Sequence, residues 1–313
     1  METLYFLGID ISKKNFQAAL TMDGINMAET QVENKAQAIK DYFRGLKGKF
    51  HFSQDRLIVC MEHTGIYCLP LLDYLVKNKI KVCVEPALQI KQSQGMARGK
   101  SDQVDAKRIA QYVYKNRQEL RFWAPQRSQV QKLKALLVLR ERLVKVKVQM
   151  EVPINETQEY IQESIRKAIG KNCQHTIKAL TADIAKVERE IKLLVEEDAQ
   201  LSEQLKWVQS VPGVGKITAL NVIISTGEFQ RIGEAKKFAC YSGVAPFEHT
   251  SGSSIRGKTR VSKMANMTLK KLLHLAAMSA IQCCKELKAF YHRKVADGKN
   301  RMSVINAVRN KLI

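Results

Sequence analysis

A stripe of apolar residues with helical spacing runs through the middle of the chain. From Ile177 to Val208, large aliphatic side chains recur at steps of three and four residues, with one gap at Asp198. This heptad pattern predicts a long helix that packs along a partner, because a strand would require alternation instead. With a second stripe between Leu133 and Val148, it predicts an antiparallel helical arm or coiled coil that also serves oligomerisation. A plain helical bundle is the alternative.

The front of the chain has a different pattern. Short apolar runs at 4–11, 16–20, 25–32, 56–62 and 80–86 alternate with helical segments at 35–46, 65–78 and 102–115. Strands that alternate with helices after an opening meander predict an α/β domain. Asn34 and Ser101 can each cap a helix, and Pro70 suits a first helical turn.

The last third is predicted to be mostly α-helical. The run VPGVGKITALNVI at 211–223 resembles a helix-hairpin-helix element, in which Gly213, Gly215 and Lys216 would meet a phosphate backbone; an ordinary glycine-rich turn is the alternative. Helices are expected around 234–241, 268–282 and 285–297, with a loop, TSGSSIRGKTR, at 250–260. Pro153 and Gly170 are expected to punctuate the middle region. The predicted domains are therefore 1–122, 123–206 and 207–313.

The charge of the chain is strongly positive. It has 52 Lys and Arg against 30 Asp and Glu, and residues 251–313 hold fourteen of the cations and two of the acids. This density favours a polyanionic partner, most simply nucleic acid, over an ordinary solvated basic surface. The seven cysteines show no zinc-ligand spacing, and neither a signal peptide nor a membrane-spanning run is found, so we expect an intracellular, reduced protein without a membrane partner.

Four acids fall where a sheet and a helix can bring them together. Asp10 and Glu62 end strand-type runs, and Asp102 and Asp105 lie three residues apart on one predicted helix. Converging carboxylates suit Mg²⁺, with Mn²⁺ as an alternative, and such ions serve phosphodiester chemistry. Each acid also has a simpler explanation: a turn former, a helix-dipole partner, or a salt bridge from Asp105 to a neighbouring cation. The cations expected to hold phosphates beside the acids are Arg98, Lys100 and Lys107.

The loop at 250–260 can bind phosphate or supply a nucleophile. From the residues alone, Ser251, Ser253 and Ser254 compete for the nucleophile role, since a serine hydroxyl can attack phosphate when it is activated. Tyr241 is better explained by core packing, and His249 by a phosphate contact or no role. The backbone of Gly252 allows close approach of DNA. The cations expected to hold flanking phosphates are Arg256, Lys258, Arg260 and Lys263.

The sequences of these motifs resemble those of one protein family. GIDISKKNF, MEHTGIY and RGKSDQVDAKRIA look like the N-terminal half of the DEDD transposases of bacterial insertion sequences, which are related to the Piv/MooV DNA invertases. VPGVGKITA and YSGVAPFEHTSGSSIRGKTRVSKMAN look like their C-terminal transposase domain, so the resemblance covers nearly the whole chain. The chain ends at Ile313, slightly earlier than this resemblance leads us to expect.

The resemblance implies a RuvC-like, RNase H-type domain whose four acids bind Mg²⁺. It implies that Ser251 is the nucleophile that joins covalently to a DNA 5′ phosphate, without a nucleotide cofactor. It also implies homodimers and tetramers, a noncoding bridge RNA that pairs with donor and target DNA, and a place at the bacterial nucleoid in the cytoplasm. Two alternatives stay open: a RuvC-like Mg²⁺-dependent nuclease or junction resolvase that uses water, and a non-catalytic nucleic-acid-binding scaffold.

Overall fold

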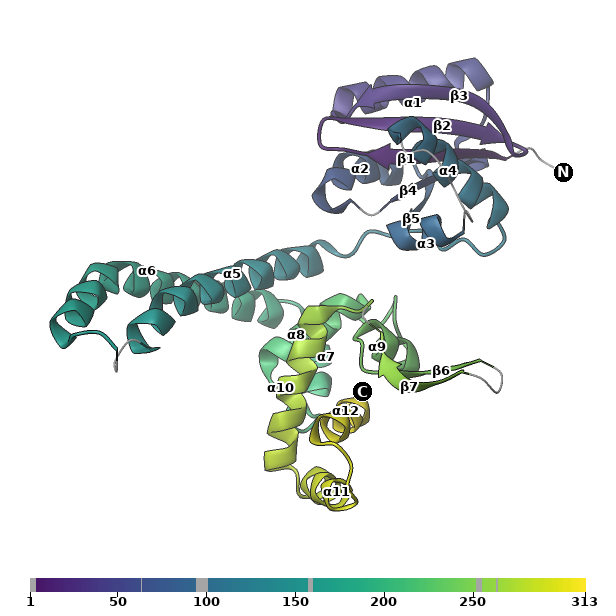
Figure 1. Cartoon of the computed structure of the whole chain (residues 1–313). Helices are drawn as coiled ribbons and strands as arrows, with labels where there is room; N and C mark the ends of the chain where they lie inside the picture. The colour runs from purple at the N-terminus through teal and green to yellow at the C-terminus, as the bar shows by residue number, and fades with distance from the viewer. Residues whose placement is uncertain (1–3, 63, 94–100, 157–159, 252–254, 263) are drawn as a thin grey trace. The chain divides into compact units, whose positions relative to one another are not determined.

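The computed structural model of the 313-residue chain describes all residues except 1–3, 63, 94–100, 157–159, 252–254 and 263. The chain divides into two compact units, Met1–Pro125 and Gln126–Ile313. Figure 1 shows a mixed sheet with helices in the first unit and a mostly helical second unit. The predicted α/β front and helical remainder are thus confirmed. The finer boundary predicted at 206/207 stays a prediction.

The first unit is built on a five-stranded sheet in the order β3-β2-β1-β4-β5. Strands β1, β2 and β3 form an antiparallel meander, and β4 and β5 continue the sheet in parallel with β1. The strands are β1 (Tyr5–Ile11), β2 (Asn15–Met22), β3 (Ile25–Glu33), β4 (Leu57–Glu62) and β5 (Lys81–Glu85). The continuous apolar run of β4 follows from its position, since a central parallel strand is buried on both faces.

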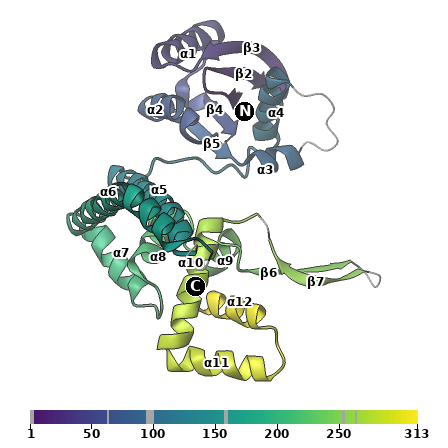
Figure 2. The ribbon, with the colours of Figure 1, turned by 60° about the vertical axis from the view of Figure 1, so that its left-hand side comes forward.

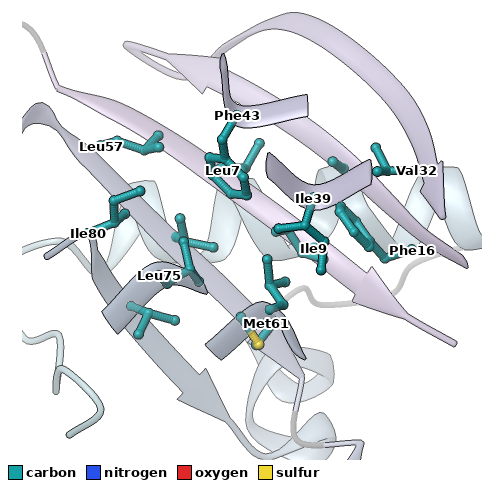
Figure 3. Packing of buried hydrophobic residues seen from close by; sticks show 14 of the residues in the cluster. Leu7, Ile9, Phe16, Val32, Ile39, Phe43, Leu57, Met61, Leu75 and Ile80 are labelled. Atoms are coloured by element: carbon teal, nitrogen blue, oxygen red, sulfur yellow. The ribbon is translucent and has the colours of Figure 1, made fainter. Parts of the chain in front are cut away.

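Helices cover both faces of this sheet. They are α1 (Ala36–Phe50), α2 (Leu69–Lys77), α3 (Ala87–Gln92) and α4 (Asp102–Lys115), with short 3₁₀ turns η1 (Gln54–Arg56) and η2 (Gly65–Cys68). Figure 3 shows the core on the α1 and α2 face, where Leu7 and Ile9 of β1 meet Ile39, Phe43 and Leu75. A second core packs α4 against the opposite face. The sheet therefore forms the middle of three layers.

The predicted helix starts are confirmed at two of three positions. The Ser101 hydroxyl accepts a hydrogen bond from the Val104 N–H at 3.3 Å, and Pro70 lies in the first turn of α2. The prediction for Asn34 is wrong. Lys35 occupies the N-cap of α1 without a side-chain bond, and the Asn34 amide donates instead to the carbonyls of Ser12 and Tyr67.

The second unit begins with an antiparallel pair of long helices, α5 (Ser128–Glu156) and α6 (Glu163–Glu196). Figures 1 and 2 show the two lying side by side. Near the start of the arm, Val130 and Leu133 share a core with Leu194, and farther along Arg140 pairs with Glu188 at 2.7 Å. An antiparallel helical arm is therefore confirmed, and its coiled-coil character stays a prediction.

The helix breaks expected at Pro153 and Gly170 are both wrong. Helix α5 continues past Pro153, and Gly170 lies inside α6. The helices are interrupted instead between Glu156 and Glu163 and again at Asp198, the one gap in the heptad stripe. Its carboxylate caps α7 (Ala199–Gln209) by accepting the Leu201 N–H at 3.0 Å, so the stripe belongs to two helices.

The remainder of the second unit confirms the predicted helices and adds one helix and two strands. The helices are α8 (Lys216–Thr226), α9 (Ala235–Tyr241), α10 (Met267–Cys283), α11 (Lys285–Ala296) and α12 (Arg301–Lys311), the last of which was not expected. The loop predicted at 250–260 is instead part of an antiparallel hairpin of β6 (Pro246–Ser251) and β7 (Ile255–Val261), which projects from the helices in Figure 2. Among the described residues, no helix is long and apolar enough to span a membrane.

Candidate active site and nucleic-acid interface

Two of the four predicted acids line one small pocket. Asp10, at the end of β1, and Asp102, the first residue of α4, share a pocket of about 60 Å³ with polar side chains from the meander. The other residues lining it are Ser12, Asn15, Phe16, Gln17 and Gln31. The pocket thus joins residues 92 positions apart in the chain and presents carboxylate, amide and hydroxyl oxygens.

Close packing of α4 on β1 brings the two acids together. A Cβ atom on Gly8 would lie 2.2 Å from the Ala110 nitrogen and 2.3 Å from the Ala106 carbonyl oxygen, so only glycine fits there. Ala106, Ala110 and Ala19 of β2 pack together and are almost fully buried. Asp10 lies two residues after Gly8, hence on the same face, and Asp102 lies one turn before Ala106. Small residues therefore set the distance between strand and helix at this pocket.

Glu62 ends the next strand. Met61 of β4 is in register with Ile9 of β1, so Glu62 follows beside Asp10 at the carboxyl ends of parallel strands. Across β4 and β5, Glu62 is in register with Glu85, a residue that the sequence motifs did not single out. Burial raises the pKa of Glu85, with a weaker opposing effect of Arg121. The signal that could have identified Glu85 was its place, since it also ends a buried strand with an acid.

Asp105 forms the salt bridge that the simpler explanation expected. Its carboxylate accepts a hydrogen bond from Arg108 at 2.9 Å. Lys107, predicted to hold phosphate, pairs with Glu29 of β3 at 2.7 Å and lowers the pKa of that glutamate. In the described ranges, no three His, Cys, Asp or Glu side chains lie close enough to hold one metal ion. The structure thus unites Asp10 and Asp102 and leaves Asp105 engaged with Arg108.

The donor set around the pocket fits a hard divalent cation. Mg²⁺ and Mn²⁺ prefer carboxylate, carbonyl and water oxygens, and Mg²⁺ is commonly held by one or two carboxylates. Asp10 and Asp102 supply that number within one pocket, and Glu62 follows on the adjoining strand. Asp105 could join them through its second carboxylate oxygen, because Arg108 bonds its Oδ1.

The serine segment lies in the second unit. Ser251 is the last residue of β6 and is opposite Ile255 of β7, and its neighbour Thr250 is opposite Arg256. Arg260 is exposed on β7. Several predicted side chains or whole residues lie outside the described part of the structure: the side chains of His249, Ser251, Arg256 and Lys258, and residues Arg98, Lys100, Gly252, Ser253, Ser254 and Lys263. Their predicted roles stay predictions.

Tyr241 is not the core residue that was expected. It ends α9 and is 37% exposed, and its hydroxyl accepts a hydrogen bond from the Asn266 amide at 3.3 Å. The Tyr241 carbonyl also accepts the Asn266 N–H at 2.8 Å, which fixes the start of α10. Its role in the described structure is to hold that helix start.

The glycines at 213 and 215 differ in their surroundings. Gly213 has a φ of +79°, and a Cβ there would lie 2.4 Å from the Ala276 carbonyl oxygen of α10. Gly215 is exposed at the N-cap of α8, and no atom lies within 4 Å of a Cβ built on it. Gly213 is therefore required by packing, whereas Gly215 and the half-buried Lys216 face open space at a helix N-terminus.

Comparisons with known proteins find relatives along most of the chain. Residues 7–157 match the profile of the DEDD transposases of IS110 type, described as "Transposase", and residues 205–292 match that of the "Transposase IS116/IS110/IS902 family". The pilin gene-inverting protein of Moraxella bovis is 25% identical over 98% of this chain and 93% of its own length. The transposase for insertion sequence element IS1111A of Coxiella burnetii is 29% identical over 67% of this chain and 64% of its own.

Among solved structures, the chain is similar to T. thermophilus RuvC in complex with a Holliday junction substrate. The match has 12% identity, covers 38% of this chain and 99% of that one, and has a TM-score of 0.30. Together, the two family profiles match most of the residues of both units. This protein is therefore a DNA transposase or recombinase that belongs to the IS110 family of transposases.

Proposed function

We propose that this transposase cuts and rejoins the DNA of an insertion sequence through a composite site, with the acids of the first unit and Ser251 of the second. The observation that carries the proposal is the pocket shared by Asp10 and Asp102, with Glu62 on the adjoining strand. Such a pocket, in a chain of this family, suits phosphodiester chemistry. In the proposal Asp10, Glu62, Asp102 and Asp105 hold Mg²⁺, which when bound stabilises charge on the scissile phosphate.

In each step of the strand transfer, one P–O bond breaks as another forms. The Ser251 hydroxyl oxygen attacks phosphorus, its proton passes to the leaving 3′ oxygen, and the P–O3′ bond breaks as a phosphoserine bond forms. The DNA 5′ phosphate is then joined to Ser251 and the 3′ end carries a free hydroxyl. Attack by another 3′ hydroxyl reverses these changes, so the exchange needs no nucleotide cofactor. The cations of the β6–β7 hairpin, Arg256, Lys258 and Arg260, would hold the flanking phosphates.

A bridge RNA and an oligomer also belong to this proposal. The net charge of +22 would accommodate a bridge RNA as well as DNA. The α5–α6 arm exposes Val138, Leu139, Val146 and Val148, all at least 41% exposed, and apolar side chains of this number on one helix favour contact with a second copy. Dimers and tetramers joined through the arm are therefore expected.

The experiment compares Ser251→Ala with Ser253→Ala and Ser254→Ala as matched controls. Each purified protein is incubated with Mg²⁺, co-purified RNA and a plasmid that carries the element ends. Covalent protein–DNA adducts are then counted after denaturation in detergent. We expect adducts from both control variants, none from Ser251→Ala, and none from Asp10→Asn. Adducts that persist in Ser251→Ala would assign the nucleophile elsewhere.

A water-using nuclease is the second candidate. It is favoured by the location of all four acids within residues 1–125, a unit with a core of its own. Mg²⁺-dependent nicking that is unchanged in Ser251→Ala and lost in Asp10→Asn would establish it. Loss of both nicking and adducts in Ser251→Ala would exclude it.

A further inference from the structure

An exposed apolar tip begins four residues after Glu62. Three large side chains on or beside η2 are open to solvent: Ile66 is 72% exposed, Tyr67 39% and Leu69 55%. We call these three residues the apolar tip. The buried face of α2, formed by Leu71, Leu72 and Leu75, contributes to the core, so the tip is not needed for packing of that helix.

The base of the tip is held at the strand end. The Cys68 thiol is buried and donates to the Glu62 carbonyl at 3.6 Å, and it also lies 2.9 Å from the Thr64 hydroxyl. Gly65 has a φ of +70°, which allows the chain to turn sharply there. Cys68, within the segment that carries the tip, is therefore bonded to the end of the strand that carries Glu62, a predicted catalytic acid.

One amide links the tip to the carboxylate pocket. The Asn34 side chain donates to the Tyr67 carbonyl at 2.9 Å and to the Ser12 carbonyl at 3.2 Å, and Ser12 lines the pocket with Asp10 and Asp102. The Asn34 N–H also donates to the Lys14 carbonyl at 2.8 Å. The Asn34 side chain thus links the tip to the turn at residues 12–15.

This turn supplies exposed positive charge beside the tip. Lys13 and Lys14 are both exposed, and the turn is closed by two hydrogen bonds from Ser12 to the Asn15 carbonyl, at 2.7 and 2.8 Å. The surface therefore combines two exposed lysines, the carboxylate pocket, and an exposed aromatic ring with aliphatic neighbours.

We propose that Tyr67, supported by Ile66, stacks on an unpaired DNA base next to the phosphate held at the Asp10–Asp102 pocket. Every base has a π-face, so an exposed ring binds unpaired bases without sequence preference, and apolar side chains can wedge between base steps. The ligand is an opened DNA strand, because the Tyr67 carbonyl is joined through Asn34 to the turn that carries Lys13 and Lys14 and borders the carboxylate pocket. Three apolar side chains are also too few for a stable protein interface. The inference rests on the proposed DNA function and adds preference for unpaired bases.

The test uses the full-length protein with Ca²⁺ in place of Mg²⁺, so that an oxygen-binding cation can join the carboxylates to a phosphate, and a denaturing gel verifies that the probe is uncleaved. Two duplex probes are compared: one with a single unpaired 2-aminopurine, and the same duplex fully paired. Wild type should bind the bulged probe more tightly and quench its fluorescence. Tyr67→Ala should lose about tenfold in affinity for the bulged probe and little for the paired one, while Tyr67→Phe should keep the wild-type preference.

Three further variants complete the design. Val76→Ala, at the far end of α2 and 37% exposed, is the matched apolar control and should behave as wild type. Lys13→Gln should weaken binding of both probes alike. Should Tyr67→Ala fail to fold, Ile66→Ala carries the test, and a lost preference there supports the proposal.

Other outcomes overturn the inference in distinguishable ways. Unchanged preference in Tyr67→Ala and Ile66→Ala would remove the stacking role and leave the proposed function intact. A change of sedimentation coefficient without a change of preference would assign the tip to contact with a second copy. With an RNA duplex of the same design as a third probe, a preference for its bulge alone would assign the ring to RNA. Failure of wild type to bind either DNA probe would remove the inference and the proposed DNA function together.

Discussion

Gly8 and Ala110 touch backbone to backbone. A side chain on Gly8 would place its Cβ 2.2 Å from the Ala110 nitrogen, a distance that no methyl group can occupy. Since α4 starts at Asp102 and β1 contains Asp10, this contact decides how near the two carboxylates come. The strand–helix contact in the first unit is therefore a determinant of the candidate site as well as of the fold.

Gly8→Ala should destabilise the first unit by about 3 kcal/mol, since the backbone of α4 must move to admit the methyl group. Chemical denaturation followed by circular dichroism measures this change. The matched control is Gly45→Ala in α1, where no atom lies within 4 Å of the added Cβ. That substitution should stabilise the protein by about 0.5–1 kcal/mol. Equal denaturation midpoints for the two variants would contradict the packing argument.

Gly213→Ala should be strongly destabilising, by about 2–4 kcal/mol, because the residue combines a φ of +79° with contact to α10. Gly215→Ala should change stability by less than about 1 kcal/mol, as only an exposed N-cap is altered. DNA binding separates the two further. If the helix N-terminus meets phosphate, Gly215→Ala weakens binding while its unfolding midpoint stays near wild type. If Gly213→Ala is as stable as wild type, α10 must be able to move away from residue 213, and the packing argument is wrong.

Arg127 connects three segments of the second unit. It donates to Asp198 at 2.8 Å and to Glu228 at 2.9 Å, and the two carboxylate side chains are only 9% and 8% exposed. Arg127→Ala leaves both without a cation and should cost about 2–3 kcal/mol, less than for a fully buried pair because Arg127 itself is 37% exposed.

Arg140→Ala is the matched control for the clamp, the name used here for the ion pairs of Arg127 with Asp198 and Glu228. Arg140 pairs with Glu188 at 2.7 Å, but that carboxylate is 46% exposed, so its loss should cost under about 1 kcal/mol. Both losses are measured as changes in the free energy of unfolding by urea. Comparable losses in the two variants would argue against the burial of the clamp.

The clamp should also make stability depend on acid pH. Burial alone would raise the pKa of Asp198, but the Leu201 N–H and Arg127 outweigh it and lower the pKa below its ordinary value. A depressed folded pKa contributes stability above the unfolded pKa, about 3.9, and this contribution disappears as pH falls through the folded value. Asp198→Asn, which keeps the capping oxygen, should therefore lose less stability than wild type between about pH 5 and about pH 3. Parallel losses in urea titrations would refute this role.

The sequence by itself determined the local elements. Apolar runs ended by acids predict the strands of Asp10 and Glu62, and the hydroxyl of Ser101 starts α4. These signals depend on near neighbours along the chain, through side-chain alternation and capping, so they can be read without a fold. The family motifs are contiguous too, so neighbouring residues alone suffice to recognise them.

Only the tertiary structure decided which distant residues meet. Asp198 caps α7 locally, but its pairing with Arg127, 71 residues earlier, is a contact that only the fold supplies. Asn34 leaves its expected cap for the Tyr67 carbonyl, 33 residues later. Glu85 lies beside Glu62 because strands β4 and β5 pair in that register. Only glycine fits at position 8 because the Ala110 backbone lies against it. Such choices depend on contacts whose partners are fixed by packing in three dimensions, and the local sequence pattern does not encode those partners.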